Sequence, residues 1–316
     1  MPALAAERSP EVSAYDLSLL EDAPTPNELF FVREHNAAPR IGAAAWRLSV
    51  GTAYEMGREE LLAFPRTKSA VTLECAENPA GGGLVSHAVW EGVPLAQLLD
   101  RARPAASTRF VRLEGFDGYE RILPIEKARD GSVLVASRMN GELLPANHGG
   151  PARALVAGRY GMDSVKWLRK VELLDAAPAS TGEYVRRTRS LLTGVTAGDP
   201  VGGMLVKSVF ARPVDGAVLS GRTFTVRGAA WGEHAIVKVE LSADDGKAWS
   251  AAKLGKQEPY CWTQWEWLWK IPAAGKHALI ARATDAKGNV QPMERDSARV
   301  DPYEQNACQR VQVTAR

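Results

Sequence analysis

The stretch SAVTLECAENPAGGG, residues 69–83, places a cysteine where a strand-like pattern gives way to turn residues. The alternating run ends next to Cys75, and Asn78, Pro79 and three glycines follow within a few positions. A side chain at the end of a strand can point into a cleft. Cys75 could therefore be a small apolar filler, a reactive thiol or a metal ligand, and the last two uses require a thiolate stabilised by nearby positive charge.

The remaining cysteines do not extend Cys75 into a familiar pattern. The chain has 3 cysteines, at positions 75, 261 and 308, an odd number at wide spacing. No Cys-x-x-Cys pair and no C-x-x-C-H sequence occurs, which excludes a zinc ribbon, a disulfide framework and covalent haem attachment.

Short helices and strands around Cys75 would position it. GREELLAF (57–64) predicts a short helix, and the segment 89–103 predicts a second one that begins near Pro94. Leu95, Leu98 and Leu99 share one face of that second helix. Further strands are predicted at 69–74, 108–115, 132–139, 152–158 and 164–174.

The interleaved helices and strands favour an α+β fold for this first part of the chain. Asn140-Gly141 predicts a hairpin turn, and no regular βαβ period is present. No G-x-G-x-x-G or Walker sequence occurs, so a Rossmann or P-loop nucleotide site has no support.

The length of 316 residues predicts two domains. We expect an irregular lead-in over 1–28, an α+β domain over 29–180 and a polar linker over 181–203. Residues 204–316 contain about seven short alternating strands separated by turn signals, which favours an immunoglobulin-like all-β sandwich. Its tryptophans are interpreted as sandwich core plus an interface face rather than a ligand cage; they are Trp262, Trp265, Trp267 and Trp269.

Charge and hydropathy exclude two classes of partner. Lys and Arg total 39 against 37 Asp and Glu, a formal charge of +2, which gives no case for nucleic-acid binding. No segment approaches the roughly 18 apolar residues of a membrane helix, and the first residues lack a secretory pattern. The chain as given is therefore expected to be cytoplasmic, with a periplasmic location as the alternative if a leader was removed.

Several segments, in order along the chain, resemble the sulfite oxidase family. They are FFVREHNAAP, LECAEN, WEGVPLAQLL, the long run from MNGELLPANHGGP to VKWLRKVEL, VKVELSADDGKAWSAAKL and GNVQP. The resemblance implies an α+β domain that binds a molybdenum–molybdopterin cofactor, followed by an immunoglobulin-like domain through which the chain forms a homodimer.

The resemblance also implies roles for individual residues. Cys75 matches the family's single protein ligand to molybdenum, and a soft thiolate suits such a metal. Arg33 and His35 match the stretch that lines the cofactor and the anion pocket, where a guanidinium offers a planar fork of donors to an oxyanion. Taken without the resemblance, Arg33 also fits a surface ion pair and His35 a structural histidine.

Four further residues match segments that hold the pterin's phosphate and its polar ring edges. They are His148, Arg153, Ser164 and Lys166. Two cations and a histidine, together with the backbone amides of HGGP, suit a phosphate. For Lys166, which we expect in a strand beside Trp167, a stem lying over apolar surface remains an alternative.

The catalytic tyrosine of the family maps least clearly. Tyr184 in GEYVRRTRS has an acidic neighbour on the expected side but no matching K-x-F sequence after it. Its hydroxyl could orient substrate and carry a proton, together with Arg33 as the other catalytic residue. A tyrosine that packs between domains stays open as the alternative.

Two departures from the family pattern bear on the substrate. Glu34 stands where the family often has Asn, and Cys75 is followed by Ala-Glu-Asn-Pro where sulfite-oxidising members carry an arginine. A dianion would lose one charge-assisted contact, worth about 1.5–3 kcal/mol. Arg186, Arg187 or Arg189 could compensate.

The sequence therefore predicts a molybdenum-dependent oxidoreductase that oxidises sulfite to sulfate and passes electrons to a separate acceptor such as a cytochrome. Two alternatives remain. One is the same chemistry on another oxyanion or an S-oxide, such as nitrate or a sulfoxide, and the other is a cofactor-free dimeric binding module.

Overall fold

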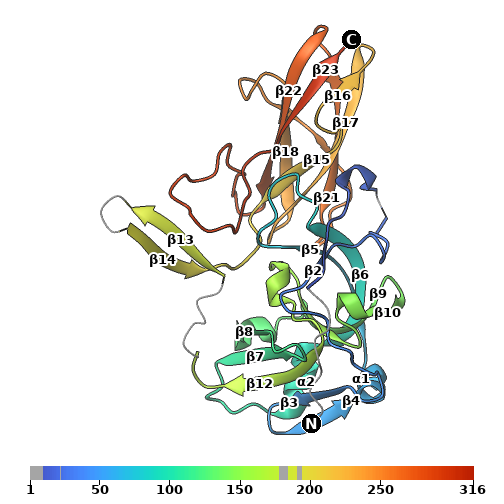
Figure 1. Cartoon of the computed structure of the whole chain (residues 1–316), viewed down its shortest axis with the longest axis vertical. Coiled ribbons are helices and arrows are strands. Elements are labelled where there is room, and N and C mark those ends of the chain that lie inside the picture. The colour runs from blue at the N-terminus through green and yellow to red at the C-terminus, as the bar shows by residue number, and fades with distance from the viewer. Residues whose placement is uncertain (1–9, 22, 178–183, 191–193) are drawn as a thin grey trace. The chain divides into compact units, whose positions relative to one another are not determined.

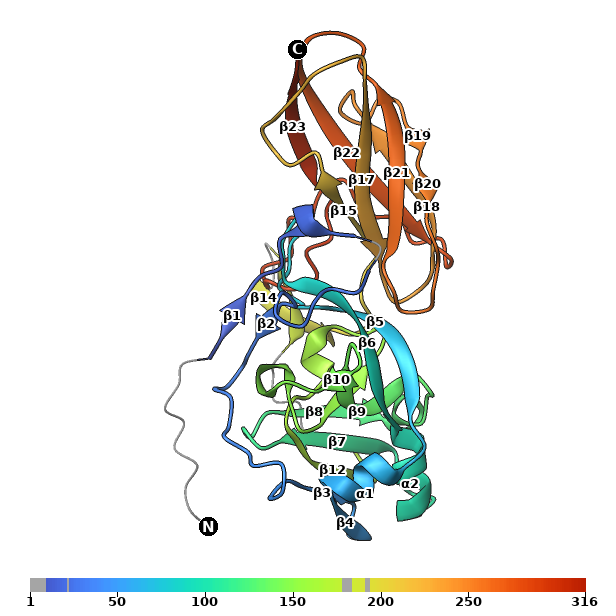
Figure 2. The same cartoon turned by 90° about the vertical axis from the view of Figure 1, so that its right-hand side faces the viewer.

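The computed structural model describes residues 10–21, 23–177, 184–190 and 194–316 (Figures 1 and 2). Over these ranges the protein is mostly β, with short helices between the strands. It divides into two units, each assembled from separate segments. The first unit is Met1–Ala14, Pro26–Cys75 and Ala88–Glu183, and the second unit is Tyr15–Thr25, Ala76–His87 and Tyr184–Arg316.

One sheet of the first unit leads to Cys75. Its strand order is β10-β9-β6-β5, and β11 pairs with β9 beside this path. The strands are β5 (Thr67–Glu74), β6 (Val85–Pro94), β9 (Val133–Met139), β10 (Glu142–Leu143) and β11 (Arg153–Val156). Cys75 follows the last residue of β5, as the alternating pattern predicts, and Asn140 and Gly141 form the predicted turn between β9 and β10.

The second sheet of the first unit has the order β4-β3-β12-β7-β8, with β12 parallel to β3 and antiparallel to β7. Its strands are β3 (Arg47–Val50), β4 (Tyr54–Gly57), β7 (Phe110–Gly115), β8 (Glu120–Pro124) and β12 (Leu168–Leu174). Apolar residues of both sheets, such as Val50, Val111 and Val135, belong to one buried core.

The beginning of β12 differs from the prediction of a strand from residue 164. Trp167 has φ 49°, so the chain turns there and the strand begins only at Leu168. The backbone N–H of Trp167 donates to the Gly149 carbonyl at 3.2 Å and its indole N–H donates to the Ala146 carbonyl at 2.7 Å. These contacts, which come from a distant turn, override the local strand pattern, and Lys166 lies in a bend and not in a strand.

The helices are shorter than an α+β layout suggests. They are α1 (Arg58–Ala63), α2 (Leu95–Ala102) and α3 (Ile125–Ala128), of 6, 8 and 4 residues. Helix α2 begins directly after Pro94 as predicted, and Leu95, Leu98 and Leu99 are fully buried. Each helix directly follows a strand, α1 after β4, α2 after β6 and α3 after β8. The first unit is therefore built mainly from its two larger sheets.

The two larger sheets of the second unit have the orders β15-β17-β21-β20 and β16-β23-β22-β18-β19. In both views of the molecule β17 and β21 run side by side (Figures 1 and 2). The strands of the first sheet are β15 (Lys207–Arg212), β17 (Thr223–Trp231), β20 (Lys253–Leu254) and β21 (Thr263–Lys270). Those of the second are β16 (Ala217–Leu219), β18 (Ile236–Ser242), β19 (Ser250–Ala251), β22 (Gly275–Asp285) and β23 (Arg310–Ala315).

Residues from both sheets of the second unit form its core. Trp265 and Trp269 are buried in this core and Trp267 packs against it in a partly buried position. These three side chains come from β21. The interpretation of these tryptophans as core residues is confirmed, and their role in an interface stays a prediction.

Two segments expected to be irregular contain regular structure. Within the predicted linker, β13 (Val185–Ser190) and β14 (Gly194–Pro200) form an antiparallel pair, and the backbone of β13 also bonds to Ala298 and Val300. The polar, arginine-rich sequence does not indicate a strand here, because the hydrogen bonds along the second edge of β13 are made with residues far along the chain. Within the predicted lead-in, β1 (Val12–Ser13) pairs with β2 (Val32–Arg33), and Leu17–Leu19 forms a 3-10 helix.

No helix in the described ranges is long and apolar enough to cross a membrane.

Candidate functional site

Three consecutive residues of interest lie at the end of β2: Arg33 is its last residue, and Glu34 and His35 follow it. Pairing with β1 fixes Glu34, since its backbone N–H donates to the Glu11 carbonyl at 3.0 Å and its Oε2 accepts from the Glu11 N–H at 2.9 Å. Glu34 is buried, whereas Arg33 and His35 are exposed on either side of it. The His35 ring lies 5.1 Å from that of Tyr119.

His148 ends a 3-10 turn, Ala146–His148, that precedes two glycines. Its Nε2 lies 2.8 Å from the Asn27 carbonyl, and since a carbonyl only accepts, Nε2 carries the hydrogen. The ring also packs edge-on against Phe30, with centroids 5.4 Å apart. Burial lowers the pKa of His148 to about 4, against the opposing effect of the Asn27 carbonyl, so the imidazole is neutral at pH 7.

The Arg153 guanidinium is buried, with 4% of the residue exposed. It donates to the carbonyls of His148 at 3.0 Å and Ser164 at 2.7 Å, and it lies 5.3 Å from the Trp90 ring centroid. Burial lowers the pKa of Arg153 to about 9, so the group remains charged at pH 7. Within the described ranges no carboxylate forms an ion pair with it.

Lys166 completes a group of three neighbours. Its Nζ donates to the Asn147 carbonyl at 2.7 Å and lies 3.9 Å from Glu34 Oε1. Burial lowers the pKa of Lys166 to about 7, the Arg153 charge adds to this effect, and the charge of Glu34 opposes it. We refer to His148, Arg153 and Lys166 as the basic cluster.

Ser164 adjoins this cluster, since its carbonyl accepts from Arg153, and the end of β5 lies beside the turn that precedes Ser164. The Ser164 hydroxyl accepts a hydrogen bond from the Val156 N–H at 3.0 Å, so it holds the end of β11. The short helix Gly161–Asp163 precedes it, and a Cβ at Gly161 would stand 3.4 Å from the Glu74 carbonyl oxygen. Glu74 is the residue before Cys75, whose side chain is partly buried.

The first unit thus brings together His148, Arg153, Ser164 and Lys166, and adds Glu34 beside Lys166. Tyr184 belongs to the second unit, where it has φ 51° and its ring lies 5.4 Å from that of Tyr303. The suggested catalytic role of Tyr184 stays a prediction.

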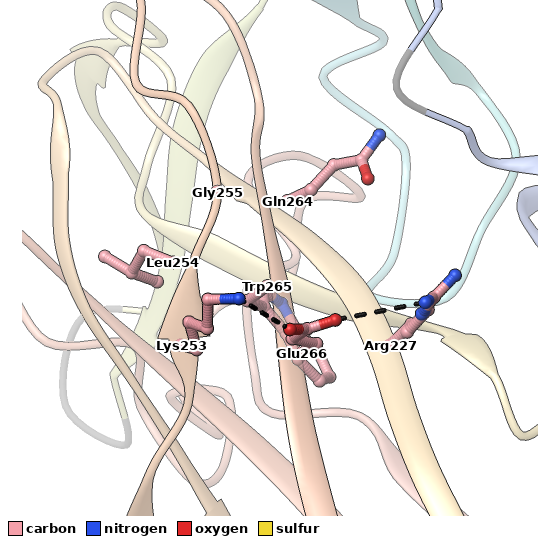
Figure 3. Close-up of a pocket in the computed structure, with 7 residues that line it drawn as sticks. All are labelled: Arg227, Lys253, Leu254, Gly255, Gln264, Trp265 and Glu266. Atoms are coloured by element: carbon pink, nitrogen blue, oxygen red, sulfur yellow. Dashed lines mark hydrogen bonds and ion pairs between the residues drawn. The ribbon is translucent and has the colours of Figure 1, made fainter.

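A polar hollow of about 200 Å³ on the second unit contains none of these residues (Figure 3). Glu266 lies at its centre, 3.0 Å from Lys253 Nζ and 3.9 Å from Arg227 Nη2. The three side chains are 41–81% exposed, so this is a surface ion-pair group of small energetic weight.

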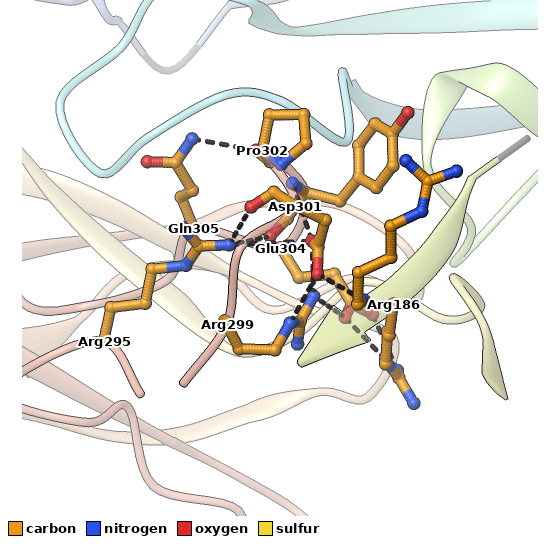
Figure 4. Close-up of polar contacts among 9 residues, drawn as sticks. Arg186, Arg295, Arg299, Asp301, Pro302, Glu304 and Gln305 are labelled. Atoms are coloured by element: carbon orange, nitrogen blue, oxygen red, sulfur yellow. Dashed lines mark hydrogen bonds and ion pairs between the residues drawn. The ribbon is translucent and has the colours of Figure 1, made fainter. Parts of the chain in front are cut away.

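A second polar cluster in the second unit was missed by sequence reasoning. The Glu304 carboxylate accepts hydrogen bonds from Nε and Nη2 of Arg186, each at 2.7 Å. The two oxygens of the Asp301 carboxylate accept from Nε and Nη2 of Arg299, each at 2.8 Å (Figure 4). Both carboxylates are almost fully buried, and Arg295 also contacts Asp301. We call this group the carboxylate clamp.

The clamp also reaches backbone groups. Asp301 accepts the Arg187 N–H at 2.8 Å, and the Glu304 N–H donates to the carbonyl of Ala76, the residue after Cys75, at 2.8 Å. No local sequence signal marks these acids, because Asp301 and Glu304 lie in a turn-rich segment far from β13.

Two family models match the chain. Residues 35–182 match the oxidoreductase molybdopterin binding domain, and residues 200–316 match the Mo-co oxidoreductase dimerisation domain. The sulfite oxidase of Gallus gallus is 31% identical over 317 residues, which cover 87% of this chain and 69% of that protein. The chain belongs to the sulfite oxidase family.

The proteins similar to this chain carry names that describe different activities. The chain is 31% identical to the mitochondrial sulfite oxidase of Mus musculus and spans 58% of that protein's length. It is 28% identical over 356 residues to the NADPH nitrate reductase of Aspergillus niger, covering 90% of this chain and 40% of that one. The crystal structure of the sulfane dehydrogenase SoxCD from Paracoccus pantotrophus superposes with a TM-score of 0.87 at 28% identity, covering 95% of this chain and 84% of that chain.

The molybdopterin-binding domain implies a molybdenum–molybdopterin cofactor, and the basic cluster fits one. Arg153 is a buried charge that donates its hydrogen bonds to carbonyl oxygens, and Lys166 has one carboxylate neighbour at 3.9 Å. Buried cations need a compensating anion, which a phosphate supplies. The Gly149 backbone lies close against Lys166, because a Cβ there would stand 3.0 Å from the lysine Cα.

Proposed function

We propose that this chain is a molybdenum-cofactor-dependent oxidoreductase that oxidises sulfite. Sulfite and water give sulfate, two protons and two electrons, and the electrons leave to a separate acceptor such as a cytochrome. The observation that carries the proposal is the buried basic cluster in the unit that matches the molybdopterin-binding domain. The cofactor supplies the two-electron chemistry when it is bound.

Each predicted residue has a part in this proposal. Cys75 Sγ holds the molybdenum. His35 and Ser164, together with the basic cluster, hold the pterin and its phosphate. Arg33 attracts the anionic substrate, and Tyr184 orients it and carries a proton.

We further propose that the second unit is an immunoglobulin-like sandwich through which two chains associate. The support is its pair of packed sheets and its match to the dimerisation domain. For location, we propose the cytoplasm for the chain as given, or the periplasm if a leader is removed.

The deciding experiment measures molybdenum and pterin in protein from a molybdenum-replete host, then sulfite-dependent reduction of an artificial acceptor. The proposal requires both cofactor components and turnover of sulfite. Cys75→Ser should remove the molybdenum while the far-ultraviolet circular dichroism stays unchanged. Protein without molybdenum or pterin would exclude the oxidoreductase activity.

A second candidate function is the same chemistry on another oxyanion or sulfur compound. Its support is the loop after Cys75, which lacks the arginine of sulfite-oxidising members and closes on itself, since Asn78 Oδ1 accepts the Leu84 N–H at 2.9 Å. Arg186, which could compensate, is engaged with Glu304 on two atoms. The nitrate reductase and the sulfane dehydrogenase among the similar proteins supply the substrates to compare.

Steady-state assays with sulfite, nitrate, a sulfoxide and a sulfane compound separate the two functions. Turnover of sulfite with the highest kcat/KM supports the first. Turnover confined to any of the others replaces it with the second.

A further inference from the structure

One buried atom beside the basic cluster accepts no hydrogen bond. Glu34 Oε1 is buried, and no donor within the described ranges makes a hydrogen bond to it. The nearest cation, Lys166 Nζ, stands 3.9 Å away, beyond hydrogen-bond distance, and donates instead to the Asn147 carbonyl at 2.7 Å. A buried carboxylate oxygen without a donor is costly, so in native proteins such an atom is normally satisfied by an ordered water or by a ligand.

The rest of the Glu34 side chain is fixed in place. Oε2 accepts from the Glu11 N–H at 2.9 Å, and the backbone N–H of Glu34 is bonded to the Glu11 carbonyl. Because Glu11 bonds to both the backbone N–H and Oε2 of Glu34, these two bonds hold Oε1 at its position beside Lys166.

The chemistry of a ligand for this atom follows from its charge. A carboxylate oxygen only accepts, so its partner must carry an N–H or O–H group, and it repels a phosphate. Arg153 and Lys166, by contrast, attract a phosphate. A ligand that spans the two must be anionic at one end and rich in N–H groups at the other, as a phosphorylated pterin is.

We propose that Glu34 is a cofactor-binding residue of this chain, whose Oε1 accepts a hydrogen bond from an N–H group on the polar ring edge of the pterin. This rests on the proposed function, because it requires the cofactor to bind. Glu34 can only accept, so it selects for a donor at that point of the ring edge.

The test compares Glu34→Gln with the wild type in two states. Glu34→Gln keeps the shape and removes the charge. In apoprotein from a host that cannot make the cofactor, its melting temperature should equal or exceed that of the wild type. In holoprotein, Glu34→Gln should lose pterin during dialysis about 10- to 100-fold faster than the wild type. The released pterin is measured by its fluorescence after oxidation.

The matched control is Glu91→Gln, a carboxylate of the same unit whose partner is Lys68 at 3.1 Å. It should release pterin at the wild-type rate. Pterin release from Glu34→Gln at the wild-type rate overturns the inference. So does a parallel loss of melting temperature in the apo and holo states, because that would be a purely structural effect.

Two further outcomes also decide the test: a Glu34→Gln variant that does not fold, and wild-type protein without cofactor. If Glu34→Gln does not fold, Glu34→Asp decides, since it keeps the acceptor but withdraws it by one methylene. Intermediate release supports the inference and wild-type release overturns it. If wild-type protein from a replete host contains no molybdenum or pterin, the proposed function itself fails.

Discussion

The carboxylate clamp allows a quantitative test of how burial changes the strength of an ion pair. The perturbation is a double-mutant cycle of Glu304→Gln and Arg186→Gln. Glu304 has a side chain that is 0% exposed, and it receives two guanidinium nitrogens at 2.7 Å plus Arg299 Nη2 at 3.1 Å. Glu304→Gln keeps the volume and removes the charge that the three bonds share.

The magnitude follows from this geometry. Removing one partner of a buried pair costs about 3–5 kcal/mol. Arg186 retains 34% of its side-chain exposure, so water compensates it partly and the lower end applies, about 3 kcal/mol for Glu304→Gln. Since the Arg299 bond survives in Arg186→Gln, we expect a coupling energy of about 2 kcal/mol.

The assay is urea unfolding at pH 7, followed by tryptophan fluorescence. The same cycle on the exposed Lys253–Glu266 pair of the same unit is the control, and it should give a much smaller coupling energy. If the two cycles give equal coupling energies, burial does not strengthen the clamp and the reasoning fails. Raising the salt concentration should weaken the control pair more than the clamp.

Three other predictions concern the basic cluster and the metal. The His148 pKa is lowered to about 4 in the folded apoprotein, so the unfolded chain binds more protons than the folded one between pH 4 and 6.5. The free energy of unfolding, measured with urea, should therefore rise by roughly 3 kcal/mol across that pH range. His148→Gln should remove this part of the pH dependence. Gly149→Ala should lower the melting temperature and the pterin content, because Gly149 has φ 100° and a Cβ would press on Lys166 at 3.0 Å; Gly118→Ala, with positive φ but open space, controls for backbone strain alone. Cys75→Ser should lose molybdenum by elemental analysis while keeping its melting temperature as apoprotein, and retained molybdenum would refute the ligand assignment.

The features that the sequence predicted depend on neighbours in the chain. Leu95, Leu98 and Leu99 lie one helical turn apart after Pro94, so their burial on one face of α2 could be read from spacing alone. Cys75 follows an alternating strand and precedes turn residues, so its place at a strand end could be predicted in the same way.

The features that the sequence did not predict depend on contacts between distant segments. The Glu34–Lys166 neighbourhood requires β2 to meet the bend before β12, and no spacing rule connects them. The resemblance identified Lys166 but gave no reason to expect a buried acceptor beside it. In the same way, β13 looked like a linker because the groups that satisfy its second edge, at Ala298 and Val300, come near the end of the chain.

The segmented make-up of the second unit sets an order of events during synthesis on the ribosome. Tyr15–Thr25 and Ala76–His87 leave the exit tunnel long before Tyr184–Arg316, the bulk of the unit to which they belong. For example, the Asn78 carbonyl accepts a hydrogen bond at 2.6 Å from Nζ of the buried Lys207, which is synthesised much later. Domains usually fold as they emerge, N-terminal part first. Here two segments of the unit are made well before the rest of it, and they bond to each other, since the Tyr15 N–H donates to the Gly83 carbonyl at 2.8 Å. A fragment that begins at residue 204 lacks both of these partner segments.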